Sequence, residues 1–214
     1  MDITHYMAVP MGLVLAPFML GVINRTKAFI AGRRGAPLLQ AYFDLWKLMK
    51  KDAVYSRTTT WVFRAAPVIG LTAVLLAMTL VPAAGSSLFK FRGDLIFFAY
   101  CLGLMRFFTV IAALDTGSSF EGMGASREVH FSTLAEPALL LGLAALAKLE
   151  GSFSLSGMFG NLSGSDWLAA GPAIALVASA VFIVFLAENA RIPVDDPNTH
   201  LELTMIHEVM ILDY

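Results

Sequence analysis

Five apolar runs, each close to the roughly 20 residues that a helix needs to cross a bilayer, limit what this chain can fold into. They cover residues 7–24, 65–84, 95–114, 131–149 and 168–186. The chain is 57% hydrophobic and only 14% charged, whereas soluble domains carry roughly 25% charged residues. The sequence therefore predicts an all-α integral membrane protein with about five transmembrane helices in one polytopic domain, residues 1–214.

The distribution of lysine and arginine predicts the orientation of these helices, because basic residues concentrate on the cytoplasmic side. Eleven of the 15 basic residues fall in the segments 25–64, 115–130 and 187–214. The opposite side holds only Lys90, Arg92 and Lys148. We therefore expect a multi-pass protein of the prokaryotic cytoplasmic (inner) membrane, with its N-terminus outside and these three segments as inner-face loops. The short outer connections, rich in Gly and Ser, are interpreted as simple turns without chemistry.

Two inner segments carry helical patterns. After Pro37, which suits a helix start, apolar side chains recur at helical spacing, and polar residues occupy the rest of the wheel. The apolar set is Leu39, Tyr42, Phe43, Trp46 and Met49. Such an interfacial helix either anchors the chain to lipid or covers a cavity or partner. In the last segment, Thr199 and Glu202 form a capping box that predicts a second inner helix over residues 200–212.

Charged residues occur within the spans and around the predicted inner face. Arg106 and Glu136 lie inside predicted spans, where a charge costs about 2.5–3.5 kcal/mol and needs protein or water around it. A structural ion pair is one interpretation of Arg106. The segment 115–130, expected to be a flexible loop, and the last segment add further titratable groups. Acids clustered at a low-dielectric rim can relay protons, and the alternative is that they are solvated span ends. The candidate proton or ion pathway residues are Arg106, Asp115, Glu121, Glu128, Glu136, Glu188, Asp195, Asp196, Glu202, His207, Glu208 and Asp213.

Several classes of function are disfavoured. The net charge is −1 and no basic patch is interleaved with aromatic residues, which argues against nucleic-acid binding. One cysteine, Cys101, cannot hold a zinc ion or an iron–sulfur cluster. His200 and His207 do not form a zinc-hydrolase motif. No catalytic, cofactor-binding or metal-binding residue is therefore predicted, and any redox cofactor is expected in other chains.

Three blocks of sequence carry a resemblance to a known family. They read GRRGAPLLQAYFDLWKLMKKD (32–52), DTGSSFEGMGASRE (115–128) with LAEPA (134–138), and ARIPVDDPNTHLELTMIHEVMILDY (190–214). In this order they resemble signatures of the complex I subunit 1 family, in the branch found in membrane-bound, energy-converting [NiFe] hydrogenases such as formate hydrogenlyase. The family continues through about three further spans, so we expect this chain to be a C-terminally truncated form of an eight-helix subunit.

The last block separates two branches of that family. Arg191, Pro193, Asp195, Pro197, Glu202 and Leu203 match the frame of the quinone-reducing branch. Asn198 and His200 stand where that branch carries acids. This departure favours the hydrogenase branch over quinone binding.

The resemblance implies a subunit without a cofactor of its own, which anchors a peripheral redox arm and couples electron transfer to proton or sodium translocation. Its implied partners are the [NiFe] large subunit, the iron–sulfur small subunit and antiporter-like membrane subunits. The alternatives are the quinone-chamber subunit of respiratory NADH-quinone oxidoreductase and a stand-alone ion transporter. The residues expected to dock the redox arm are Arg33, Arg34, Gln40, Asp44, Trp46, Lys47, Arg127 and Arg191.

Overall fold

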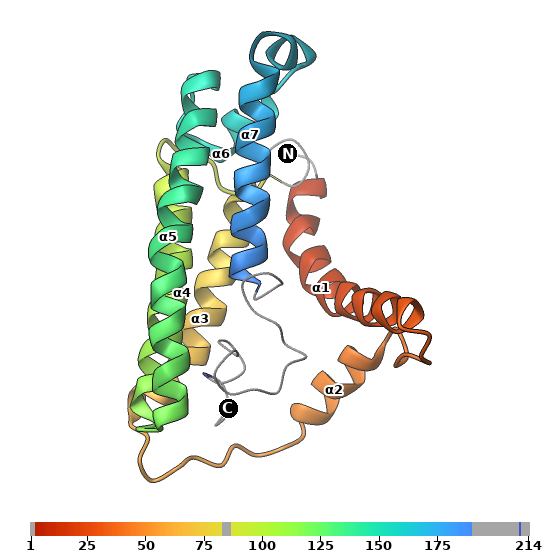
Figure 1. Ribbon diagram of the computed structural model, residues 1–214, viewed down its shortest axis with the longest axis vertical. Coiled ribbons are helices and arrows are strands. Elements are labelled where there is room, and N and C mark those ends of the chain that lie inside the picture. The colour runs from red at the N-terminus through yellow and green to blue at the C-terminus, as the bar shows by residue number, and fades with distance from the viewer. Residues whose placement is uncertain (1–2, 83–86, 190–209, 211–214) are drawn as a thin grey trace. The chain divides into compact units, whose positions relative to one another are not determined.

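The computed structural model describes residues 3–82, 87–189 and 210, and within these ranges it contains helices and connections but no strand. The chain divides into two compact units, residues 1–55 and 56–214. Each unit is described by itself. The expectation of a single domain stays a prediction. Figure 1 shows the helices of both units along the chain.

The first unit contains α1 (Ile3–Ile30) and α2 (Gln40–Leu48). The chain returns against α1 at Gly21, where an added Cβ would lie only 1.9 Å from the carbonyl oxygen of Leu38. The hydroxyl of Tyr42 donates a hydrogen bond to the carbonyl of Val14. Close packing at Gly21 and this hydrogen bond hold α2 to α1.

The amphipathic helix predicted after Pro37 is confirmed as α2, which begins at Gln40. Its place on the inner face stays a prediction. None of its residues is buried. Phe43 and Trp46 each expose 61% of their surface. An apolar helix face that is uncovered in this way fits contact with lipid or with a partner.

The second unit contains α3 (Trp61–Leu80), α4 (Asp94–Asp115), α5 (Ser119–Glu150), α6 (Leu155–Gly160) and α7 (Gly164–Glu188). Helix α4 packs against α3 and α5, and α5 also contacts α6 and α7 (Figure 1). Consecutive long helices run in opposite directions. One end of the bundle therefore holds Asp115 and the start of α5, and the other holds α6. We call these the Asp115 end and the α6 end.

Five helices are long and apolar enough to cross a membrane, which confirms the five predicted spans in the described part of the chain. Their outer surfaces are apolar. Phe107 exposes 58% of its surface, and Leu141 and Leu176 each expose 72%. Exposed apolar area on this scale is typical of contact with lipid or partner subunits. The chain is an all-α integral membrane protein.

The expected flexible loop over residues 115–130 is wrong from Ser119 onward. Helix α5 contains 32 residues, which corresponds to about 48 Å, whereas the hydrocarbon core of a bilayer is roughly 30 Å thick. Only residues 116–118 separate α4 from α5, and Gly117 makes the turn with a φ of 72°. Gly124 and Ala125 are buried along α5, so packing of small residues outweighs the low helix propensity of glycine.

Local signals define several helix ends. The Thr60 hydroxyl accepts a hydrogen bond from the amide of Val62 (3.2 Å) and caps α3. Helix α5 ends at Gly151, whose φ of 63° is the left-handed conformation that favours glycine. Ser163 and Asp166 form a capping box at the start of α7.

The connection between α5 and α7, which the sequence predicted to be a simple turn, has a structure of its own. It contains α6, of which Leu155, Ser156, Gly157 and Met158 are buried. The Met158 side chain is fully enclosed in an apolar cluster with Leu80, Leu95, Leu143 and Leu146. Burial of the apolar Met158 side chain in this cluster explains why the short helix folds back into the bundle.

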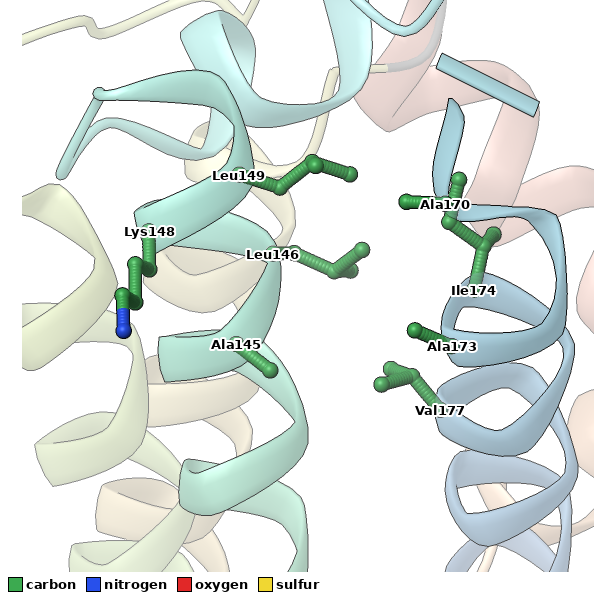
Figure 2. Close-up of a pocket in the computed structure, with 8 residues that line it drawn as sticks. All are labelled: Ala145, Leu146, Lys148, Leu149, Ala170, Ala173, Ile174 and Val177. Carbon is green, nitrogen blue, oxygen red and sulfur yellow. The ribbon is translucent and has the colours of Figure 1, made fainter. Parts of the chain in front are cut away.

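Helices α5 and α7 touch closely at Gly142, where an added Cβ would lie 3.4 Å from the Val181 side chain. Towards the α6 end they enclose an apolar cavity of about 350 Å³, lined by Leu146, Ile174 and Val177 among others (Figure 2). Helix α7 departs from helical geometry at Ala170, beside this cavity. The Lys148 side chain points away from α7 and leaves the cavity apolar (Figure 2).

Candidate functional site

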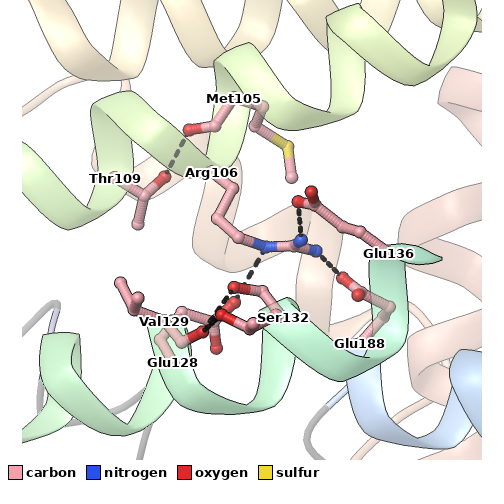
Figure 3. A network of polar contacts seen from close by, with 9 residues as sticks. Met105, Arg106, Thr109, Glu128, Val129, Ser132, Glu136 and Glu188 are labelled. Atoms are coloured by element: carbon pink, nitrogen blue, oxygen red, sulfur yellow. Dashed lines mark hydrogen bonds and ion pairs between the residues drawn. The ribbon is translucent and has the colours of Figure 1, made fainter.

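Arg106 is the centre of an ion-pair cluster inside the second unit. It lies within α4, and its side chain is only 10% exposed. Its Nε donates to Oε1 of Glu128 at 3.1 Å. Its Nη1 donates to Oε1 of Glu136, and its Nη2 donates to Oε2 of Glu188. Figure 3 shows the guanidinium between the three carboxylates.

Two helices present these carboxylates to α4. Glu128 and Glu136 both belong to α5, and Glu188 is the last residue of α7. Two turns of α5 separate the first pair, so the planar guanidinium of Arg106 reaches them with different nitrogen atoms. An arginine side chain offers five N–H donors in a fixed geometry, which allows one residue to join three elements.

Arg106 and Glu136 bind each other, although the predicted spans placed them at different depths, Arg106 near the middle of the third span and Glu136 about one turn inside the fourth. That difference came from starting the fourth span at residue 131. Because α5 begins at Ser119, Glu136 lies well inside the helix rather than near its end.

The cluster holds one guanidinium and three carboxylates, and all four belong to helices that are apolar enough to cross a membrane. It is closed on one side and open on the other: the Glu128 side chain is 10% exposed, Glu188 30% and Glu136 48%. The three carboxylates have more acceptor oxygens than the Arg106 guanidinium has N–H donors. This arrangement can bind a proton or a cation and exchange it on the open side.

Glu121 adds a further carboxylate to the same helix. It lies in the first turn of α5, on the buried stripe that also contains Ala125 and Glu128. The residue is 1% exposed, and neither carboxylate oxygen has a hydrogen-bond partner in the described part of the chain. A buried carboxylate is costly unless a proton, a cation or a donor binds it.

Asp115, the last residue of α4, binds the start of α3 through its carboxylate. Its carboxylate accepts hydrogen bonds from the Thr60 amide at 2.7 Å, the Thr60 hydroxyl at 2.8 Å and the Phe63 amide at 3.3 Å. These bonds satisfy free backbone donors at a helix N-terminus. The geometry gives Asp115 a capping contact that the sequence did not reveal, and its part in an ion pathway stays a prediction.

The predicted docking residues of the first unit lie on its surface. Gln40 Nε2 donates to Asp44 Oδ1 at 2.9 Å along α2. The Lys50 ammonium lies 5.0 Å from the centre of the Trp46 ring. Arg33, Arg34 and Lys47 are exposed, and Arg127 is half-buried on α5. Their docking role stays a prediction.

The predicted helix over residues 200–212 lies outside the described residues, apart from helical Met210. The same holds for seven predicted site residues, Arg191, Asp195, Asp196, Glu202, His207, Glu208 and Asp213.

Met210 is buried against Ala113 and Ala125, and Ala125 lies one turn after Glu121 on α5. Met210 falls within the helix predicted over residues 200–212, and that helical pattern does not indicate this contact. The close approach of Ala113 and Ala125, both small residues, leaves room for the methionine side chain.

A second polar network, at the α6 end, was missed from the sequence. The carboxylate of Asp94, which is fully buried, accepts hydrogen bonds from the Ser154 hydroxyl at 2.7 Å and the Leu155 amide at 2.8 Å. Ser87 and Ser156 bind each other through their hydroxyls at 2.7 Å. Asp94 directly before an apolar span was the available signal.

No group of three or more His, Cys, Asp and Glu side chains suited to a metal ion occurs in the ranges that the structure describes. Cys101 is a buried free cysteine and supplies a single sulfur.

Apolar helices around an internal arginine–carboxylate cluster define a polytopic membrane protein with charged residues inside its spans. The NADH dehydrogenase family matches residues 3–209, and the chain belongs to this family.

Curated relatives include components of two hydrogenase systems. The chain is 34% identical over 191 residues to formate hydrogenlyase subunit 4 of Escherichia coli (strain K12), covering 88% of this chain and 62% of that protein. It is 35% identical over 192 residues to hydrogenase-4 component C of the same organism, covering 89% of this chain and 60% of that protein. The chain therefore spans about three-fifths of the length of these relatives.

Two further proteins are similar. An NADH-quinone oxidoreductase subunit from Rubrobacter xylanophilus (strain DSM 9941 / JCM 11954 / NBRC 16129 / PRD-1) is 31% identical over 183 residues, covering 80% of this chain and 52% of that protein. A chain in the solved structure of the membrane-bound sulfane sulfur reductase, an archaeal respiratory membrane complex, aligns with a TM-score of 0.69. The alignment is 22% identical and covers 99% of this chain and 73% of that chain, so it shows the shared fold.

Proposed function

We propose that this chain is a membrane subunit of a multisubunit, energy-converting [NiFe] hydrogenase. In this role it anchors the redox arm and couples electron transfer and hydrogen formation to the translocation of protons or sodium ions. Its membrane is the prokaryotic cytoplasmic membrane, with the N-terminus outside and the Asp115 end on the cytoplasmic side. Similarity to formate hydrogenlyase subunit 4 and hydrogenase-4 component C supports the hydrogenase assignment.

The single observation that carries the proposal is the cluster in which Arg106 binds Glu128, Glu136 and Glu188. Charges inside apolar helices are expensive and therefore mark ion pathways. Glu121 adds a further carboxylate on α5, closer to the Asp115 end than Glu128. A proton or cation entering there meets Glu121 first and reaches the Arg106 cluster next.

The redox cofactors of this complex belong to partner subunits in the proposal. The [NiFe] large subunit and the iron–sulfur small subunit carry electrons to the site of hydrogen formation, and antiporter-like subunits extend the membrane part. This chain supplies the docking surface. Basic Arg33, Arg34 and Lys47, together with the uncovered Trp46 of α2, suit contact with a partner near the membrane surface.

The second candidate is the quinone-chamber subunit of a respiratory NADH-quinone oxidoreductase. Similarity to the Rubrobacter protein and the family match favour it. The exposed aromatic face of α2, with Phe43 and Trp46, also suits a quinone. The hydrogenase assignment is preferred because two hydrogenase relatives align over a larger share of this chain, 88% and 89% against 80%.

The deciding experiment is purification of the complex through a tag on this chain in mild detergent. Its nickel and flavin content and its hydrogen evolution from a reduced low-potential dye are then measured. Nickel together with hydrogen evolution is the expected result. A nickel-free, flavin-containing complex that reduces quinone would move the assignment to the quinone-chamber subunit, and a lone chain with neither activity would favour a transporter.

A further inference from the structure

A second cavity lies at the α6 end, away from the Arg106 cluster. It has a volume of about 590 Å³ and is lined by two short connections of the second unit. One connection leads into α4 and the other leads from α5 to α6. Its lining includes Lys90, Phe91, Arg92, Ser152, Phe153 and Ser154.

Hydrogen bonds between the two connections fix the walls of this cavity. Buried Asp94 accepts from the Ser154 hydroxyl at 2.7 Å, across 60 residues of sequence. The Ser87 amide donates to the Ser156 hydroxyl at 2.8 Å. The Ser152 side chain packs on Gly157, where an added Cβ would lie 2.1 Å from its hydroxyl oxygen. The cavity is therefore held open by the fold rather than by chance contact between surface loops.

The exposed charged side chains that line the cavity are both basic. Lys90 and Arg92 are exposed on one wall, and neither forms an ion pair with any residue of the described ranges. The Asp94 carboxylate is fully buried beneath them, and its oxygens are occupied by Ser154 and Leu155. Glu150 precedes the second connection but does not line the cavity. An anion in the cavity would meet two cations and no accessible acid.

The residues that line the cavity lie at the α6 end of the bundle, where α4 begins and α5 ends. Phe91 and Phe153 line it and expose 46% and 59% of their surface. Basic residues at the ends of transmembrane helices lie at the level of the lipid headgroups, and the two phenylalanine rings place an apolar surface next to them. An occupant must therefore combine an anionic group with an apolar part.

We propose that this cavity binds the phosphate group of an anionic phospholipid. Lys90 and Arg92 bind the phosphate, since a lysine ammonium and an arginine guanidinium both donate to its oxygens. Phe91 and Phe153 contact the glycerol and the first methylene groups of the lipid. The bound lipid covers the place where the α3–α4 connection meets the α5–α6 connection. Beneath it, the Ser154 hydroxyl donates a hydrogen bond to the buried Asp94 carboxylate.

The test uses native mass spectrometry of the intact complex in detergent with added phosphatidylglycerol or phosphatidylcholine. The wild type is expected to retain phosphatidylglycerol preferentially. Lys90→Gln and Arg92→Gln are each expected to weaken this retention about 5-fold, since one basic residue near a lipid surface contributes about 1 kcal/mol. The double variant is expected to lose the preference.

Lys148→Gln is the matched control, because Lys148 lies near the same end on α5 but does not line this cavity. It is expected to retain the lipid, and Arg92→Lys, which conserves charge, is expected to retain most of it. Equal retention by the double variant, or an equal loss in Lys148→Gln, overturns the proposal. Displacement of the lipid by millimolar inorganic phosphate alone overturns the assignment to a lipid. Unchanged elution of each variant on size exclusion verifies that the complex assembles. If the double variant fails to assemble, lipid retention by the two single variants decides the test.

Discussion

Arg106, within α4, binds the carboxylate of Glu188, the last residue of α7, across 82 positions of sequence. The same guanidinium binds Glu128 and Glu136 of α5. One side chain therefore joins three helices at the point where α7 leads into the acidic segment 190–214.

Arg106→Gln is expected to destabilise the protein, because it removes the guanidinium that binds Glu128, Glu136 and Glu188 between the helices. Breaking a buried ion pair by removing one partner costs about 3–5 kcal/mol. Thermal unfolding in detergent measures the loss. The double variant Arg106→Gln/Glu128→Gln removes both members and is expected to recover part of the stability. If the double variant is as unstable as the sum of the two single variants, the pair does not couple.

Glu121→Gln is expected to reduce the number of ions translocated per hydrogen formed while leaving the fold intact. Glutamine keeps the shape of the side chain but cannot take up a proton, and it removes a buried carboxylate that has no partner in the described residues. Ion uptake and hydrogen evolution in membrane vesicles give the ratio. Glu150→Gln, at the other end of α5, is the control and is expected to leave the ratio unchanged. Equal ratios in Glu121→Gln and wild type would return Glu121 to a structural role.

The sequence predicted much of the fold because apolar runs, helix periodicity and capping patterns are local. All five spans and α2 follow from such patterns. The start of α5 was missed because glycine and serine favour loops, whereas burial of Gly124 and Ala125 against neighbouring helices decides the outcome. The candidate residues Arg106, Glu128, Glu136 and Glu188 were all found as charges, but their convergence on one guanidinium depends on packing between α4, α5 and α7. The capping role of Asp115 and the buried Asp94 network depend on contacts across many residues, which periodicity does not encode.

Asp115→Ala is expected to lower stability by about 0.5–2 kcal/mol, the usual cost of losing a side chain that caps a helix. Its carboxylate receives the Thr60 and Phe63 amides at the start of α3. Asp115→Asn keeps one acceptor oxygen and is expected to lose less. Thermal unfolding is the measurement, and Asp52→Asn, an exposed acid outside any helix, is the control. A fall in ions per hydrogen without a fall in stability would assign Asp115 to the ion pathway instead.

Gly21→Ala is expected to disturb the packing of the first unit. Alanine is favoured over glycine within a helix by about 1 kcal/mol, but here its Cβ would lie 1.9 Å from the Leu38 carbonyl oxygen. Backbone atoms cannot move aside as a flexible side chain can, so the chain after α1 must shift. Protease accessibility of residues 31–39 is expected to increase. Gly103→Ala is the matched control, since nothing lies within 4 Å of an added Cβ there, and it is expected to be neutral or stabilising.

Asp195, Asp196 and Glu202 lie in the acidic segment that follows Glu188, and their role is predicted from sequence alone. Alanine at any of them is expected to abolish hydrogen evolution in intact membranes. The released redox arm is expected to keep its hydrogenase activity with an artificial dye, because its cofactors are expected in other chains. Hydrogen evolution in both preparations is the measurement. Parallel loss of both activities would mean that the segment assembles the complex rather than couples it. Loss confined to membranes, together with the same effect in Glu188→Gln, would connect the segment to the Arg106 cluster through the end of α7.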